Sequence, residues 1–177
     1  IDIFEKNIFI IDNFIRAVIA VSPNKIIFIS SASVYGEDVV HSDKIDENTP
    51  VVNRSYYGMA KYMSELLLDK VCSEINTKLT ILRPPLVYGD GDTSFGYGPT
   101  GFLRKAIDGE TNIIWGDGNE LREFIYIDDV VNIINRLVNS EFEGILNIVS
   151  GKSYTYSDVI RIIKDNFCFD IDVASRE

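Results

Sequence analysis

The chain has 177 residues, of which 46% are hydrophobic and 25% are charged, as is typical of an ordinary globular domain. The formal net charge of −10 argues against a nucleic-acid partner, because neutralising phosphates requires clustered Lys and Arg. A small anionic ligand is still compatible with this charge, since one or two arginines in a concave site can hold a diphosphate. No stretch reaches the roughly 18 uninterrupted apolar residues of a membrane helix.

The two cysteines, Cys72 and Cys168, are too few and too far apart for a disulfide framework or a metal knuckle. We therefore expect a cytoplasmic protein with no metal site and no membrane partner. His41 is the only histidine, and it stands beside Ser42 and Asp43 in a polar stretch. It is the single candidate for a scheme with a histidine base, and we favour no direct role for it.

Helices and strands alternate along the chain. Apolar residues recur at spacings of three and four between residues 2 and 21, which predicts a helix that is apolar on more than one face. The apolar run at 25–30 is typical of a parallel strand buried on both faces. The later elements are predicted to be a helix at 55–74, a strand at 79–82, a glycine-rich loop at 89–101, a helix at 102–108, strands at 112–115 and 123–127, a helix at 128–139, a strand at 145–149 and a helix at 157–165. This order predicts an α/β fold with a parallel sheet.

Tyr57 and Lys61 lie four residues apart on the helix predicted at 55–74, so their side chains project from the same face. A nearby ammonium favours the phenolate and lowers a tyrosine pKa from its ordinary value of about 10, which makes tyrosine a usable base. This spacing also arises by chance, but Tyr57 is the only tyrosine that has a lysine four residues later.

Ser30, Ser31 and Ser33 follow the carboxyl end of the first buried strand, which is where open α/β sheets bind their ligands. Four sequence blocks in this order, spanning residues 30 to 129, resemble the signatures of the extended short-chain dehydrogenase/reductases, the NAD-dependent epimerase/dehydratase family. The blocks are S-S-A-S-V-Y-G, Y-G-M-A-K, R-P-P-L-V-Y-G and R-E-F-I-Y-I-D-D. The resemblance implies a Rossmann-like, doubly wound parallel sheet, present in part, and a smaller C-terminal substrate-binding region. Residues 1–88 then form the C-terminal part of the NAD(P)-binding domain, and 89–177 mainly the substrate-binding region, with elements that return to the sheet.

The resemblance also implies roles for individual residues. Ser31 matches the serine or threonine that hydrogen-bonds the reacting sugar hydroxyl or ketone. Tyr57 matches the base, and Lys61 matches the lysine that holds the nicotinamide ribose and lowers the tyrosine pKa. Pro84 and Pro85 match the stretch that passes the nicotinamide ring.

Further ligand contacts are expected on the same basis. Arg122 matches an arginine that family members use on the substrate diphosphate, and Ser30 is a candidate cofactor contact. Ser33 and Leu86 are candidate substrate contacts, although Leu86 stands where many epimerases carry an asparagine. For five residues we favour structural roles: Ser30 and Ser33 in capping the loop, Tyr35 and Tyr88 in core packing, and Arg83 in pairing with a carboxylate.

The implied activity is the NAD- or NADP-dependent conversion of a nucleotide sugar through a 4-keto intermediate, with C4 epimerisation favoured. The alternatives are a reductase of a nucleotide 4-keto-6-deoxy sugar, and a non-catalytic or truncated relative that keeps only the fold. Dehydration is the least expected reaction, because Ala32 and Ser33 stand where family dehydratases place Asp and Glu. A homodimer is expected, in which the helices at 2–21 and 55–74 form a four-helix bundle with their copies.

The stretch 96–101 fits the dinucleotide pattern G-x-G-x-x-G, but turn-forming residues precede it and only a short helix follows. A dinucleotide-binding loop requires a strand before it and a helix after it. Asp117 does not complete the motif, because glycines flank it in another turn. We interpret the stretch as a loop over the substrate. The family's own glycine-rich loop is expected before the first block, in a part that this sequence does not contain, so the chain alone is expected to be inactive.

Overall fold

The computed structural model describes residues 1–36, 44–93, 98–167 and 171–176. The chain divides into two compact units. Unit 1 comprises Ile1–Pro84 and Asn132–Ile148, and unit 2 comprises Pro85–Val131 and Val149–Glu177.

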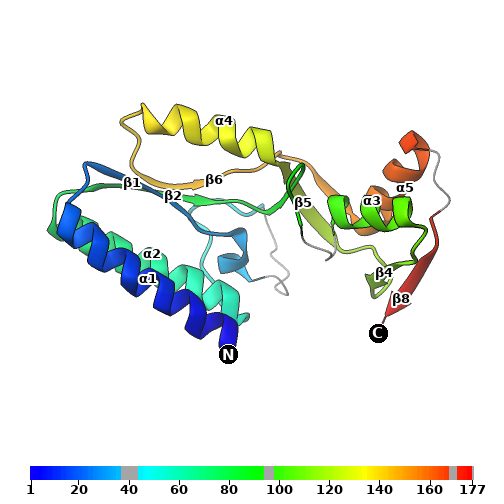
Figure 1. Ribbon diagram of the computed structural model, residues 1–177, viewed down its shortest axis with the longest axis horizontal. Coiled ribbons are helices and arrows are strands. Elements are labelled where there is room, and N and C mark those ends of the chain that lie inside the picture. The colour runs from blue at the N-terminus through cyan, green and yellow to red at the C-terminus, as the bar shows by residue number, and fades with distance from the viewer. Residues whose placement is uncertain (37–43, 94–97, 168–170, 177) are drawn as a thin grey trace. The chain divides into compact units, whose positions relative to one another are not determined.

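Unit 1 contains a parallel sheet with the strand order β1-β2-β6. The strands are β1 (Lys25–Ile29), β2 (Lys78–Arg83) and β6 (Gly144–Asn147). Helices α1 (Asp2–Val21) and α2 (Tyr56–Glu74) cover one face, and α4 (Ile127–Val138), whose first turn belongs to unit 2, covers the other (Figure 1). Parallel strands with helices on both faces confirm the predicted Rossmann-like arrangement.

The core of unit 1 lies between α1, α2 and the sheet. Its buried side chains include Val18 of α1, Leu68 of α2 and Ile81 of β2. Leu68 is fully buried, which contributes about 1.5–3 kcal/mol relative to an exposed leucine. The outer faces of the two helices stay apolar, as the pattern at 2–21 predicts. Their exposed apolar residues include Ile3, Phe9, Ile10, Phe14, Ile19, Met59, Met63, Leu66 and Leu67.

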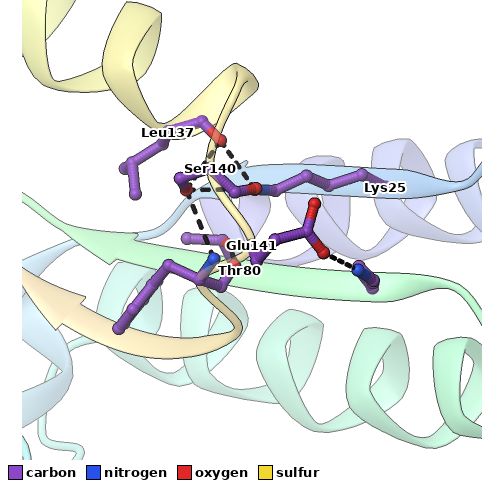
Figure 2. A network of polar contacts seen from close by, with 7 residues as sticks. Lys25, Thr80, Leu137, Ser140 and Glu141 are labelled. Carbon is purple, nitrogen blue, oxygen red and sulfur yellow. Dashed lines mark hydrogen bonds and ion pairs between the residues drawn. The ribbon is translucent and has the colours of Figure 1, made fainter.

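The connection from α4 to β6 is fastened to the other two strands (Figure 2). Lys25 Nζ donates hydrogen bonds to the carbonyl oxygens of Leu137 at 2.6 Å and Ser140 at 2.7 Å. Carbonyls at the end of a helix lack hydrogen-bond partners within the helix and carry partial negative charge. The Lys25 ammonium supplies both hydrogen-bond donors and a positive charge. Thr80 Oγ1 donates to the carbonyl oxygen of Phe142 at 2.9 Å. These bonds join the connection to β1 and β2 just before β6 begins.

The described part of unit 2 contains two small sheets. In the first, β5 (Leu121–Tyr126) pairs in parallel with β3 (Leu86–Tyr88) and antiparallel with β7 (Ser153–Thr155). In the second, β4 (Asn112–Trp115) pairs in parallel with β8 (Val173–Arg176). The rings of Phe102 and Phe124 meet Tyr156 edge-on at centroid distances of 5.9 and 6.2 Å. Helices α3 (Pro99–Asp108) and α5 (Tyr156–Phe167) therefore share a core with β5.

The predicted elements are present with bounds shifted by a few residues. Among the described residues, four elements were not predicted: the 3₁₀ helix η1 (Ala32–Tyr35), where a loop was expected, and the strands β3, β7 and β8. Each has three or four residues, too few for a periodic pattern. Cys72 is buried in α2, and Cys168 lies outside the described residues. Within the described ranges, no helix is both long and apolar enough to cross a membrane.

Candidate functional site

Ser31 lies in the turn that follows β1; residues 31–36 are here called the Ser31 turn. Ser31 has an extended backbone and caps η1: its Oγ accepts hydrogen bonds from Ser33 N at 3.2 Å and from Ser33 Oγ at 2.9 Å. Serine is favoured at such a position because its oxygen satisfies a free backbone N–H. Ala32 N donates to the carbonyl oxygen of Pro84 at 2.8 Å, which fastens the turn to the end of β2. The turn is thus fixed at the carboxyl edge of the sheet.

The contacts of Ser31 determine what its hydroxyl can offer a ligand. A serine hydroxyl has one proton to donate and two lone pairs that accept. Both recorded bonds to Ser31 Oγ are accepted ones. The remaining capacity is donation, which suits an oxygen without a proton, such as a ketone or an alkoxide.

Tyr57 and Lys61 lie in the first turns of α2, as predicted. Lys61 Nζ lies 5.8 Å from the centroid of the Tyr57 ring and 5.2 Å from that of Phe28. It also donates to the carbonyl oxygen of Ile29 at 2.9 Å. Burial lowers the Lys61 pKa, and the charge of Glu65 works in the opposite direction. A cation is therefore held between Tyr57 and the end of β1.

The start of α2 packs closely against the Ser31 turn. Ser55 caps the helix by accepting from Gly58 N at 2.9 Å. A Cβ on Gly58 would lie only 2.6 Å from the carbonyl oxygen of Ser33, so only glycine fits at this contact without a shift. The side-chain amide nitrogen of Asn53 faces two carbonyl oxygens and donates a hydrogen bond to each, to Gly58 at 3.2 Å and to Val34 at 3.3 Å. The structure thus brings together the segments that carry Ser31, Tyr57 and Lys61.

A buried ion pair lies beneath these segments. Arg83 Nε donates to Glu65 Oε1 at 3.0 Å, and Arg83 Nη2 donates to Glu65 Oε2 at 2.5 Å. Arg83 Nη1 donates to Tyr35 Oη at 2.8 Å, and Tyr35 Oη donates to Asn147 Oδ1 at 2.9 Å. The Ser30 hydroxyl donates to Glu65. Burial disfavours the charge of Arg83, but its bonds to Glu65 and Tyr35 outweigh this effect and raise its pKa.

Three of the predicted structural roles can be judged here. Arg83 pairs with a carboxylate and Tyr35 is buried in the core, as predicted. Ser30 is buried as well, but its hydroxyl bonds Glu65 instead of capping the loop. Its contact with a cofactor stays a prediction, as does the contact of Ser33 with a substrate.

The proline pair and Leu86 stand where the chain passes from unit 1 to unit 2. Pro84 is buried at the end of unit 1, and Pro85 is the first residue of unit 2. Leu86 is partly buried in β3, where its side chain lies against Gly98 at the start of α3. Leu86 packs against the core of unit 2.

Arg122 lies in β5 of unit 2, and its side chain is 27% exposed. It forms an ion pair with Glu120. Its contact with a substrate diphosphate stays a prediction.

Other sequence candidates contribute less. His41 and residues 94–97, and with them the start of the G-x-G-x-x-G stretch, lie outside the described residues. Asp117 lies in a turn, as predicted, where bonds from Asn119 lower its pKa. Tyr88 packs against the core of unit 2.

A cavity of about 550 Å³ lies beside α2, and Glu65 and Arg83 are among its lining residues. Ser31, Tyr57 and Lys61 do not line it. It therefore lies apart from the candidate chemistry. Glu65 was not predicted as part of the site. It lies four residues after Lys61 on the same helix face, and this spacing is the signal in the sequence that points to it.

The chain is similar in sequence to a known protein family and to individual known proteins. The sequence model of the NAD dependent epimerase/dehydratase family matches residues 1–148. A putative UDP-glucose 4-epimerase of Methanocaldococcus jannaschii is 34% identical over 149 residues, which cover 82% of this chain and 48% of that protein. The dTDP-4-dehydro-6-deoxyglucose reductase of Escherichia coli is 35% identical over 147 residues, with coverages of 79% and 45%.

A similar solved structure is that of a UDP-N-acetylglucosamine 4-epimerase from Methanobrevibacter ruminantium, in complex with UDP-N-acetylmuramic acid. It superposes with a TM-score of 0.86 at 28% identity, covering 97% of this chain and 56% of that one. The chain spans about half the length of the curated relatives described above.

Proposed function

Because the chain belongs to the NAD-dependent epimerase/dehydratase family, we propose that the protein in which it occurs inverts carbon C4 of a nucleotide-activated sugar through a 4-keto intermediate. The observation that carries this proposal is the packing of the Ser31 turn against the start of α2, which bears Tyr57 and Lys61. The arrangement supplies a hydroxyl donor, a candidate base and a cation at the carboxyl edge of a parallel sheet, where such folds bind ligands.

In the proposed reaction, Tyr57 takes the proton from the C4 hydroxyl and later returns it. Lys61 favours the phenolate form of Tyr57 by charge attraction. Ser31 donates its remaining hydrogen bond to the oxygen that changes from hydroxyl to ketone. When bound, the nicotinamide cofactor supplies the acceptor and donor of the hydride.

The residues present fit the nicotinamide end of that cofactor. An ammonium has three donors, and Lys61 directs one of them to the carbonyl oxygen of Ile29. The other two suit the ribose hydroxyls. Tyr57 and Lys61, together with Pro84 and Pro85, here called the Pro84 segment, would therefore hold this part of the cofactor. Of the two cofactors predicted, the family description supports NAD.

The test of the proposal follows nicotinamide absorbance and product stereochemistry together, using the complete protein and UDP-, GDP-, dTDP- and CDP-sugars. A C4 epimerase returns the hydride to the opposite face of the same carbon, so we expect a C4 epimer with no net change in absorbance.

A second candidate is a reductase of a nucleotide 4-keto-6-deoxy sugar. The 35% identity to the E. coli reductase favours it, as does Leu86 in place of the asparagine of many epimerases. A reductase would oxidise one NAD(P)H per turnover with a 4-keto sugar and yield no epimer from any hexose. A protein inactive in both assays would be the non-catalytic relative.

Arg122→Ala is expected to raise KM for the nucleotide sugar by about 10-fold or more with kcat nearly unchanged, because a diphosphate contact supplies uniform binding. Steady-state kinetics measure KM for the nucleotide sugar, and titration with NAD measures the affinity for the cofactor. Arg161→Ala is the control, since Arg161 is an exposed arginine of unit 2 paired with Asp158. Equal losses for sugar and NAD would contradict the assignment.

A homodimer forms part of the proposal. The exposed apolar residues of α1 and α2 support it, because such faces are usually covered by a partner. Sedimentation velocity should give twice the mass of the monomer, and replacing Phe9 and Leu67 with glutamate should give the monomer.

A further inference from the structure

We infer that the buried residues Ser30, Tyr35, Glu65 and Arg83, here called the ion-pair cluster, hold the Ser31 turn and the start of α2 at the spacing that proton transfer requires. The inference rests on the proposed function for the chemistry that the spacing serves. It assigns positioning roles to Tyr35, Glu65 and Arg83, which are predicted to touch no ligand, and to Ser30 in addition to its predicted cofactor contact.

Three members of the ion-pair cluster lie next to a candidate site residue in the chain or on its helix face. Ser30 directly precedes Ser31, and Glu65 follows Lys61 by one helical turn. Arg83 directly precedes the Pro84 segment. The cluster therefore joins the ends of β1 and β2 to α2, and Tyr35 adds the end of the Ser31 turn and, through Asn147, strand β6.

The geometry of the Arg83–Glu65 pair restricts how the two side chains are oriented. Arg83 meets Glu65 with two parallel bonds, and its third donor group reaches Tyr35. Such a planar fork restricts orientation more than a single point charge does. The side chains of Arg83 and Glu65 are only 2% and 3% exposed, so solvent screens this pair much less than it screens a surface pair.

Stability alone does not account for this pair. Replacing a buried ion pair with apolar residues of similar size is often neutral or stabilising, because the charges lose their hydration on burial. Here the pair joins three segments that carry candidate site residues. Glu65 also opposes the effect of burial on the Lys61 pKa, which helps Lys61 keep its charge.

The test is the triple variant Ser30→Ala, Glu65→Leu, Arg83→Met in the complete protein with NAD. No buried charge is left alone, and Tyr35 keeps its bond to Asn147, so the variant is expected to fold. We expect kcat to fall by about 10- to 100-fold with KM changed by less than about 3-fold. A misplacement of the reacting groups by about 1 Å can lower the rate by about 100-fold. A kcat within about 2-fold of the parent in the folded variant would overturn the inference.

The matched control is Thr80→Val. Thr80 is a fully buried residue of the same strand as Arg83, and its hydroxyl bonds the carbonyl oxygen of Phe142 outside the ion-pair cluster. This variant loses a buried hydrogen bond without touching the cluster, so its kcat should stay at the parent value.

A second measurement does not depend on catalysis. Hydrogen exchange of the triple variant should be faster at the amides of residues 32–36 and 56–61 and unchanged in α1. Tyr35→Phe removes a single oxygen and keeps the ring, so it replaces the triple variant in this test if that variant does not fold. It should show a smaller increase in exchange at the same amides. Unchanged exchange at these amides in the folded variants would overturn the inference. A parent protein inactive on every nucleotide sugar would refute the proposed function instead, and the exchange result would still decide the positioning role.

Discussion

Tyr57→Phe is expected to lower kcat by about 100-fold or more, the usual scale for a positioned acid–base group. The substitution removes the oxygen that takes and returns the proton, and it keeps the ring next to Lys61. Because this ring is only partly buried in the first turn of α2, the free energy of unfolding should change little. Steady-state kinetics and denaturant unfolding of the complete protein measure both effects.

Tyr56→Phe is the matched control, since the same atom is removed one residue earlier. The Tyr56 side chain is 51% exposed, and its loss should leave kcat unchanged. If Tyr57→Phe kept most of the activity while folding normally, Tyr57 would have no part in the proton transfer.

Gly58→Ala is expected to impair both folding and catalysis. The added methyl group would lie 2.6 Å from the carbonyl oxygen of Ser33, a backbone atom that cannot rotate away. Overpacking of this kind costs about 1–3 kcal/mol of unfolding free energy. The contact joins the Ser31 turn to the helix of Tyr57, so the shift should also lower kcat by about 10- to 100-fold.

Met59→Ala is the matched control for Gly58→Ala, because it introduces alanine one position later on the same helix. Met59 is 38% exposed, so this variant should stay within about 0.5 kcal/mol of the parent, as most surface substitutions do. The two variants are compared by thermal unfolding and by kcat. A Gly58→Ala protein as stable and as active as the Met59→Ala protein would show that the helix and the turn are not in close contact.

The long elements of unit 1 follow from the sequence because their patterns are strong. The helix predicted at 2–21 has those same bounds, and the strand predicted at 79–82 extends by one residue at each end. Strands β3 and β7 escape prediction because each has three residues, and pairing with β5 determines their conformation. Tertiary contacts of this kind leave no periodic signal.

The candidate site is predictable where a residue type carries the chemistry. Tyr57 and Lys61 are identified by their spacing on one helix face. Glu65 continues that stripe, and a polar stripe ordinarily indicates a solvent-exposed face. Here it is buried against Arg83, and only the fold brings together two residues 18 positions apart in the chain. The sequence predicts a carboxylate partner for Arg83 but does not identify it.

The place of β6 beside β2 has a consequence for biosynthesis. These strands pair in parallel, yet residues 84–143 separate them in the chain. On the ribosome, α1, β1, α2 and β2 are complete while one edge of β2 still lacks its neighbour. At roughly 5–20 residues per second, this edge stays open for about 3 to 12 s. An open strand edge is a template for pairing with another chain, so the nascent protein is exposed to aggregation through β2 during this interval.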